Sequence, residues 1–180
     1  MGLIDSYSEA NSDTQFVLGS GVNTRIGQSF TGNGAPLDSA MFYLKIATGT
    51  PAGNLTASIY THSGVFGTSS VGTGAALATS DVVPASTLTG SFALIEFTFT
   101  GVNRITPTNA TKYIVAVEDS SADASHNEHV GVDQTSPTHA GNSCYYDGAV
   151  WTADNAYDVI FYANSFNYRA AYFYRRQGFQ

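Results

Sequence analysis

The sequence has little charge, a single cysteine and no long apolar run, and each shortage excludes a class of protein. Only 12% of the 180 residues are charged, so the Glu- and Lys-rich pattern of long amphipathic helices is missing. Cys144 is the only cysteine, which rules out an intrachain disulfide. No apolar stretch approaches the roughly 20 residues that cross a bilayer as a helix. We therefore expect neither a helical bundle nor a membrane protein.

A secretory signal is also missing from the start of the sequence. The chain opens Met1-Gly2-Leu3-Ile4-Asp5, without a basic segment followed by an apolar core. We therefore expect the protein to be made in a cytoplasm and to fold there without disulfides.

Sequence motifs of common enzymes are absent. Gly-x-Ser-x-Gly, a Walker-type loop and His-Glu-x-x-His do not occur. Glu96 and Glu118 fall on neighbouring expected strands and could face one another as a glycosidase carboxylate pair does. Both lie opposite the more apolar face of their strand, so a solvated sheet surface explains them better. The sequence predicts no enzymatic activity.

Gly, Ser, Thr and aromatic residues are abundant, and they favour an all-β fold. The chain has 11 Tyr, 11 Phe and 18 Gly. The strongest pattern lies between Ser91 and Asp119, where apolar and polar residues alternate in two runs, as in half-buried antiparallel strands. One face of the first run holds Ala93, Ile95, Phe97 and Phe99, and one face of the second holds Tyr113, Val115 and Val117. We expect Ile95 and Phe97 to be buried between two sheets.

About ten short strands separated by turns predict an antiparallel two-sheet sandwich. One or two strands are expected within 3–18. Further strands are expected at 24–31, 37–47, 55–60, 77–83, 129–133, 144–146, 150–152 and 157–163. The segments 61–76 and 120–128 are rich in Gly, Ser and Asp, and we expect them to be exposed loops at one end of the sandwich.

Several potential metal ligands lie close together in the sequence. They are His126, Glu128, His129 and His139, near Asp119, Asp123 and Asp133. Zinc or calcium could be held by such a set. The spacing matches no specific ligand pattern, so solvated loop residues explain it better. We expect no cofactor, with calcium as the open alternative.

Three aromatic residues surround an expected hairpin turn at Asp147-Gly148. Tyr145, Tyr146 and Trp151 could stack on sugar rings, because a flat ring matches the apolar face of a sugar. The alternative is that Trp151 and one tyrosine belong to the core. Alternation allows only one of Tyr145 and Tyr146 to face inward.

The last segment, 164–180, differs from everything before it. It contains no acid, whereas residues 1–168 contain all fourteen acids and four of the seven basic residues, a net charge of −10. Such an acidic body repels nucleic acid. Aromatics and arginine are enriched in interface hot spots, so the sequence predicts a sandwich domain at 1–163 and a docking segment at 164–180. Its expected contact residues are Phe166, Tyr168, Arg169, Tyr172, Phe173, Tyr174, Arg175, Arg176 and Phe179.

A family resemblance covers roughly residues 25–163. It rests on LDSAMFYLKIATGTPAGNLTASIYTHSG, ALATSD, FALIEFTFTG, TKYIVAVE and YYDGAVWTADNAYDVIFYA. These strand and turn patterns resemble the jelly-roll modules of structural proteins in tailed bacteriophages. They are also similar to bacterial surface domains of the choice-of-anchor type.

The resemblance implies a jelly-roll sandwich without a transferable active-site motif. It favours a non-enzymatic virion surface protein: a capsid decoration protein, a head fibre or a tail-fibre component. Its partners would be other virion proteins and further copies of the chain, with a trimer as one arrangement. The alternative is a carbohydrate-binding module or adhesin that recognises glycans.

Overall fold

The computed structural model describes residues 2–19, 23–49, 53–119, 123 and 125–166. The described chain is all-β, with three single-turn 3₁₀ helices at Glu9–Asn11, Ala85–Thr87 and Gly101–Asn103. Its strands are β1 (Gly2–Tyr7), β2 (Thr14–Leu18), β3 (Arg25–Thr31), β4 (Leu37–Thr48), β5 (Asn54–Ser63), β6 (Val71–Thr79), β7 (Val83–Pro84), β8 (Ala93–Thr98), β9 (Lys112–Asp119), β10 (Asn127–Asp133), β11 (Ser143–Tyr146), β12 (Trp151–Asp154), β13 (Asp158–Val159) and β14 (Phe161–Ser165).

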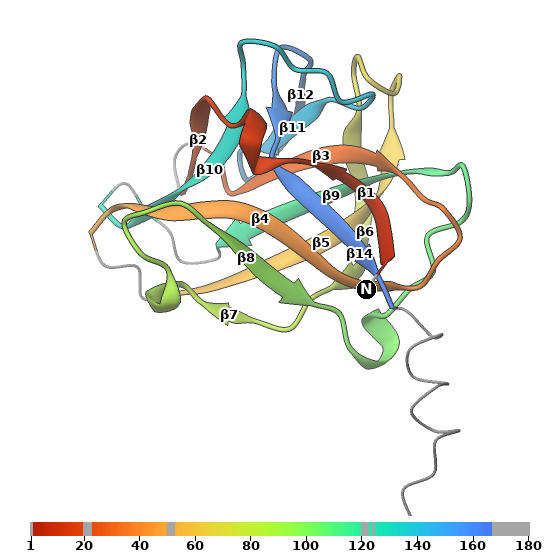
Figure 1. Ribbon diagram of the computed structural model, residues 1–180, viewed down its shortest axis with the longest axis horizontal. Helices are drawn as coiled ribbons and strands as arrows, with labels where there is room; N and C mark the ends of the chain where they lie inside the picture. Colours follow the sequence, from red (N-terminus) through yellow and green to blue (C-terminus); the bar gives the residue numbers. More distant parts are fainter. Residues whose placement is uncertain (1, 20–22, 50–52, 120–122, 124, 167–180) are drawn as a thin grey trace, which may run out of the picture.

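Eight of these strands form a jelly roll. Sheet 1 contains the order β1-β14-β4-β8, and sheet 2 contains the order β3-β9-β5-β6. Numbered along the chain, the eight strands follow the orders 1-8-3-6 and 2-7-4-5, which is the pairing of an eight-stranded double Greek key. Figure 1 shows the two sheets layered one over the other. The expected antiparallel jelly-roll sandwich is therefore confirmed.

The remaining strands widen both sheets. In sheet 1, β10 pairs with the part of β4 that follows the segment paired with β14, and β2 and β13 pair with β10. In sheet 2, β11 pairs with β3, and β12 pairs with β11. Apart from β2 and the short β7, these strands come from the single connection between β9 and β14. The connection between the last two jelly-roll strands is thus the main elaboration of the fold.

The core fills the space between the sheets. Phe42 and Phe97 meet edge to face within it, with ring centroids 6.1 Å apart. Phe97 and Phe99 are fully buried, as the alternation predicts, whereas Ile95 is half-buried and packs against the core margin. Burial of each such side chain contributes about 1.5–3 kcal/mol to the stability of the fold. The buried aromatic and aliphatic side chains therefore hold the two sheets together.

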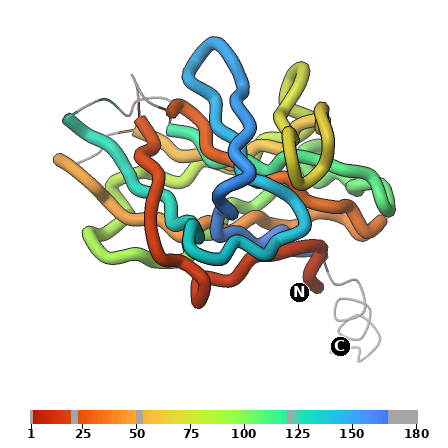
Figure 2. Tube along the Cα trace, turned by 90° about the horizontal axis from the view of Figure 1, so that it is seen from above, coloured from red at the N-terminus to blue at the C-terminus, as the bar shows by residue number. Residues whose placement is uncertain are grey.

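Sheet 2 has a second, smaller core on its outer face. Ile114 and Ala116 of β9, Tyr60 of β5 and Cys144 of β11 are buried there, against Val71 and Trp151. They can be buried because the sheet curls until its edge strands β6 and β12 approach each other. In Figure 2 the β5–β6 and β11–β12 hairpins both project on the same side of the body. Strand β9 is consequently buried on both faces.

The two alternating runs between Ser91 and Asp119 do not form neighbouring strands, contrary to expectation. β8 pairs with β4 in sheet 1, while β9 lies between β3 and β5 in sheet 2. Glu96 accepts a 2.7 Å hydrogen bond from Ser39, and Glu118 forms an ion pair with Arg25. Glu96 and Glu118 therefore do not form a glycosidase-like carboxylate pair, because they lie in different sheets and on the strand faces opposite the core residues Phe97 and Val117.

The segment 61–76 is not one long loop. β5 runs to Ser63 and β6 begins at Val71, so the two strands form a hairpin with a short tip. Ser70 and Gly72 are buried, although most of the segment is exposed. The segments 61–76 and 120–128 also lie at opposite ends of β5, since Asp119 pairs with Leu55 and Val71 with Ser63.

The end of the sandwich also differs from expectation. The strand expected at 157–163 is divided at Ile160, whose amide donates to the carbonyl of Gly131. β14 then extends through Ser165. Asn164 and Ser165 are buried in sheet 1, so the sandwich includes two residues assigned above to the docking segment. Within the described residues, no helix is long and apolar enough to cross a membrane.

Candidate functional site

The outer face of sheet 2 brings together five polar and aromatic side chains that we call the aromatic–arginine cluster. Its members are Arg25, Tyr60, Glu118, Tyr146 and Trp151. Strand register explains their meeting: Arg25 lies opposite Glu118 on one side and Tyr146 on the other, and Tyr146 lies opposite Trp151. Side chains at directly opposed positions share a face, so a continuous row crosses β9, β3, β11 and β12.

Arg25 is at the centre of this row. Its guanidinium carbon lies 4.6 Å from the ring centroid of Tyr146 and 5.8 Å from that of Tyr60, while its Nε donates to Glu118. Burial lowers the pKa of Arg25, but the hydrogen bond to Glu118 and the electrostatic contributions of Tyr60, Glu118 and Tyr146 together raise it by more, so the net shift is upward. The cation is held in place by a carboxylate and two rings.

Trp151 closes the cluster. Its ring centroid is 5.4 Å from that of Tyr146 and 5.3 Å from that of Tyr60, which meets it edge to face. Tyr146 and Trp151 remain half-exposed, whereas Tyr60 is buried. Half-exposed aromatic rings beside a paired arginine and glutamate offer an apolar surface bordered by hydrogen-bonding groups. That combination suits the ring of a neutral polyol or sugar.

Tyr145 does not belong to this cluster. It packs against the main core between the sheets, on the opposite face of β11 from Tyr146. Only two of the three expected aromatic residues therefore meet, as alternation required. Arg25 and Tyr60 were not singled out from the sequence, and Glu118 was considered only as a partner of Glu96, because the residues that these side chains meet lie on strands far away in the chain.

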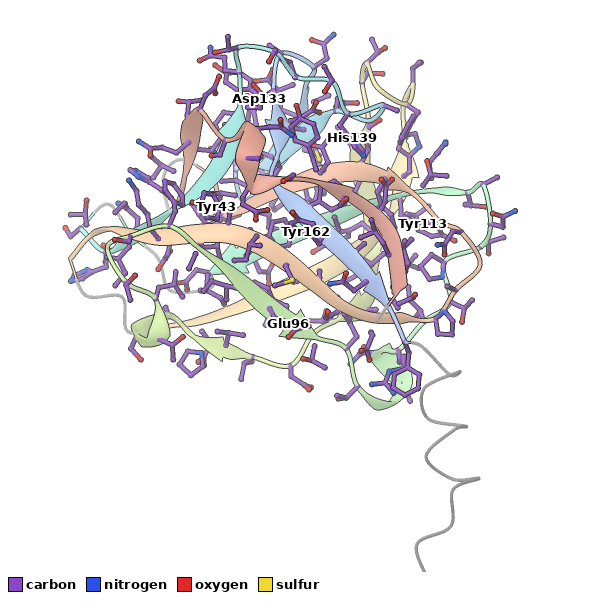
Figure 3. All side chains as sticks on the ribbon, in the orientation of Figure 1. Tyr43, Glu96, Tyr113, Asp133, His139 and Tyr162 are labelled. Carbon is purple, nitrogen blue, oxygen red and sulfur yellow. The ribbon has the colours of Figure 1, made fainter. Side chains whose placement is uncertain are left out.

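A buried polar network fills one end of the sandwich. The Tyr7 hydroxyl donates to Asp133 at 2.5 Å, and Asp133 also accepts from the Ser136 amide at 3.0 Å. Asp158 accepts from the Gln28 side chain and from the His139 amide, each at 2.8 Å. Figure 3 shows Asp133 and His139 near each other at this end. Both buried carboxyls are thus compensated by donors.

The tautomer of His139 follows from its partners. Nδ1 faces the Gly141 amide at 3.0 Å and the Gln28 side-chain nitrogen at 3.1 Å, so it must accept. Nε2 then carries the proton and donates to Asp5 at 3.2 Å. Gln28 is oriented by its own acceptor contact with the Val159 amide. The network ties the loop after β10 to β1, β3 and β13, a structural role.

The potential metal ligands of the sequence are dispersed. His126 contacts Asp123 in an exposed turn, at 3.1 Å, and His139 belongs to the network just described. Among the described residues, no three His, Cys, Asp or Glu side chains gather as a metal-binding group. Asp119 and Glu128 do meet, at the other end of the sandwich.

The expected docking residues are described only at their start. Phe166 donates its amide to Pro36, and its ring lies 5.0 Å from the guanidinium carbon of Arg104. Arg104 in turn pairs with Asp38 at 3.0 Å. The other expected docking residues lie outside the described residues: Tyr168, Arg169, Tyr172, Phe173, Tyr174, Arg175, Arg176 and Phe179.

Comparison with protein-family models, with curated proteins and with solved structures finds no match for this chain.

Proposed function

We propose that this chain is a non-enzymatic surface protein of a bacteriophage particle, in which the jelly roll is exposed and the C-terminal segment docks on the particle. One observation carries this proposal. All eight jelly-roll strands are complete at Ser165, and the sequence after it holds three of the seven basic residues and no acid. The body before it carries a net charge of −10. The protein divides into a closed acidic body and a cationic, aromatic segment.

This division suits attachment to another protein. Aromatic and arginine side chains supply most of the binding energy at protein interfaces, whereas exposed charge pairs contribute about 1 kcal/mol or less. The partners would be other virion proteins or further copies of this chain, in a closed symmetric oligomer such as a trimer. The acidic body would keep the exposed module soluble and away from nucleic acid.

Truncation after Phe166 tests the proposal. The cut leaves β14 and the contact of Phe166 with Arg104 intact. The shortened protein should keep its circular dichroism and a cooperative melt but lose assembly or particle binding. Phe173→Ala combined with Tyr174→Ala should act in the same direction, and Arg175→Glu should weaken attachment most at low salt. A truncated protein that still decorates particles would overturn the proposal.

A second candidate function is glycan recognition by the aromatic–arginine cluster. It is favoured by the half-exposed Tyr146 and Trp151 beside Arg25 and Glu118. A glycan array with the full chain should show binding that Tyr146→Ala abolishes. Tyr145→Phe is the matched control, because Tyr145 faces the core. Equal loss of binding in both variants would contradict this site.

A further inference from the structure

Three exposed apolar side chains lie on segments that meet at one corner of the sandwich, and we call them the apolar corner. They are Leu77, Val82 and Val102, which are 46%, 60% and 94% exposed. Val102 is the most exposed large apolar side chain of the described residues. Apolar surface of this kind is stabilised when a partner covers it.

Hydrogen bonds hold the three segments of the apolar corner together. The amide of Thr79, near the end of β6, donates to Asn103 Oδ1 at 3.3 Å. The hydroxyl of Thr100 donates to Asp81, in the turn between β6 and β7, at 2.9 Å. Both Thr100 and Asn103 belong to the 3₁₀ helix Gly101–Asn103 and its N-cap. The corner is therefore a surface that exists before any partner binds.

Strand β14 ends at the same corner. Phe166 follows it, and the Phe166 ring lies 5.0 Å from the guanidinium carbon of Arg104, which is the C-cap of the 3₁₀ helix. The Phe166 amide donates to the carbonyl of Pro36 at 3.0 Å. Figure 1 shows this helix, in green, beside the end of β14. The chain thus leaves the sandwich close to Val102.

The segment 167–180 matches the apolar corner in composition. Its aromatic residues are Tyr168, Tyr172, Phe173, Tyr174 and Phe179. It also contains three arginines and no acid, whereas the corner includes the exposed carboxylate of Asp81. A segment of this length spans up to about 50 Å when extended, which is enough to reach the corner of an adjacent molecule.

We propose that the segment 167–180 of one molecule docks on the apolar corner of a second copy, and that this contact builds a closed symmetric oligomer. The inference rests on the docking role proposed above for the segment and names the surface that receives it. Because the chain exit and the apolar corner lie together, a symmetry axis beside them lets neighbouring copies exchange their segments. The aromatic rings cover Leu77, Val82 and Val102, and an arginine pairs with Asp81. The cationic segments also offset the repulsion between the acidic bodies.

Sedimentation velocity of the full-length protein measures this self-association. Val102→Glu places an acid on the docking surface and should weaken the association at least about tenfold. The fold should persist, because Val102 is almost fully exposed. Val65→Glu is the matched control: Val65 is 64% exposed but lies between β5 and β6, at the other end of β6 from Leu77. It adds the same charge and should assemble as the wild type does.

A mixing experiment shows whether the segment docks on another copy. Val102→Glu has an altered surface and an intact segment, whereas Phe173→Ala combined with Tyr174→Ala has the reverse. Each variant alone should stay monomeric at concentrations at which the wild type assembles. An equimolar mixture of the two should associate, because one intact segment meets one intact surface. Circular dichroism and a cooperative melt confirm that both variants are folded.

The outcomes separate this inference from the proposed function. A monomeric wild-type protein, an equal loss of assembly in Val65→Glu, or a mixture that does not associate would overturn docking on a second copy. If Val102→Glu assembles normally while truncation after Phe166 abolishes particle binding, the proposed function stands and the apolar corner is not the surface. If the truncated protein both assembles and binds particles, the two proposals fail together.

Discussion

Gly72 and Trp151 pack so closely that no side chain fits between them. A methyl group on Gly72 would lie 2.8 Å from Cε2 of the indole and 2.9 Å from Cζ2. Gly72 belongs to β6 and Trp151 to β12, so this contact joins the two edges of sheet 2. The absence of a side chain at Gly72 is what allows the sheet to curl over its second core.

Gly72→Ala should displace Trp151 from the aromatic–arginine cluster. Because neither the backbone nor the indole can yield without loss of contacts, we expect a destabilisation of about 1–3 kcal/mol. Trp151 is the only tryptophan, so its fluorescence reports the displacement directly. Gly90→Ala is the control, because a Cβ there meets nothing within 4 Å. An unchanged emission spectrum in Gly72→Ala would contradict the packing described.

Phe97→Ala should be among the most destabilising single substitutions. The side chain is fully buried and meets Phe42 across the core, and truncation of a buried Phe costs about 3–5 kcal/mol. Urea unfolding measures the loss as a shift of the midpoint. Val102→Ala, at a residue 94% exposed, should change the stability by no more than about 0.5 kcal/mol. A loss well under 1 kcal/mol for Phe97→Ala would show that the strand faces the other way.

The Cys144 thiol should be unreactive in the folded protein. It is 0% exposed in the second core, and burial raises its pKa far above the ordinary value. Only the thiolate attacks disulfide reagents. Labelling should therefore be slow in buffer and complete within seconds in denaturing urea, with one thiol per chain. Fast labelling of the native protein would mean that the edges of sheet 2 open readily.

Asp5 should contribute to acid stability. Burial raises its pKa, but hydrogen bonds from His139 and from the Thr31 and Ser6 amides lower it by more, so the net pKa lies below the ordinary value of 3.8. The ionised carboxylate therefore stabilises the native state above about pH 4, and this contribution disappears as the pH falls through the lower native pKa. Asp5→Asn should flatten the stability profile between pH 4 and pH 2. An unchanged slope in urea titrations would refute the assignment.

The faces of individual strands could be read from the sequence, because alternation depends only on neighbouring residues. Phe97, Val115 and Val117 are buried as expected. The partner of each strand could not be read in this way. β8 and β9 are consecutive and similarly patterned, yet the Greek-key crossing places them in different sheets. Period-two patterns do not encode which edge of which sheet a strand joins.

Only the part of the aromatic–arginine cluster that lies close together in the sequence could be predicted. Tyr146 and Trp151 flank one hairpin turn, so their proximity follows from local sequence. Arg25 and Tyr60 join them only through the register of β3, β11, β9 and β5. Glu128 was noticed as a potential ligand, but its burial depends on the packing of one sheet against the other. The sequence shows which side chains share one face of a strand, whereas the pairing and packing of the strands determine which side chains of different strands come into contact.

The pairing of the first strand with the last has a consequence for biosynthesis. β1 pairs with β14, so residues 2–7 cannot form their strand hydrogen bonds until residues 161–165 have left the ribosome. At about 5–20 residues per second, this interval lasts roughly ten to thirty seconds. During that time the edge of β4 that β14 will occupy is open to strands of other nascent chains. Slow translation or crowded polysomes should therefore favour misassembly, and a chaperone that holds the first strand should raise the yield of folded protein.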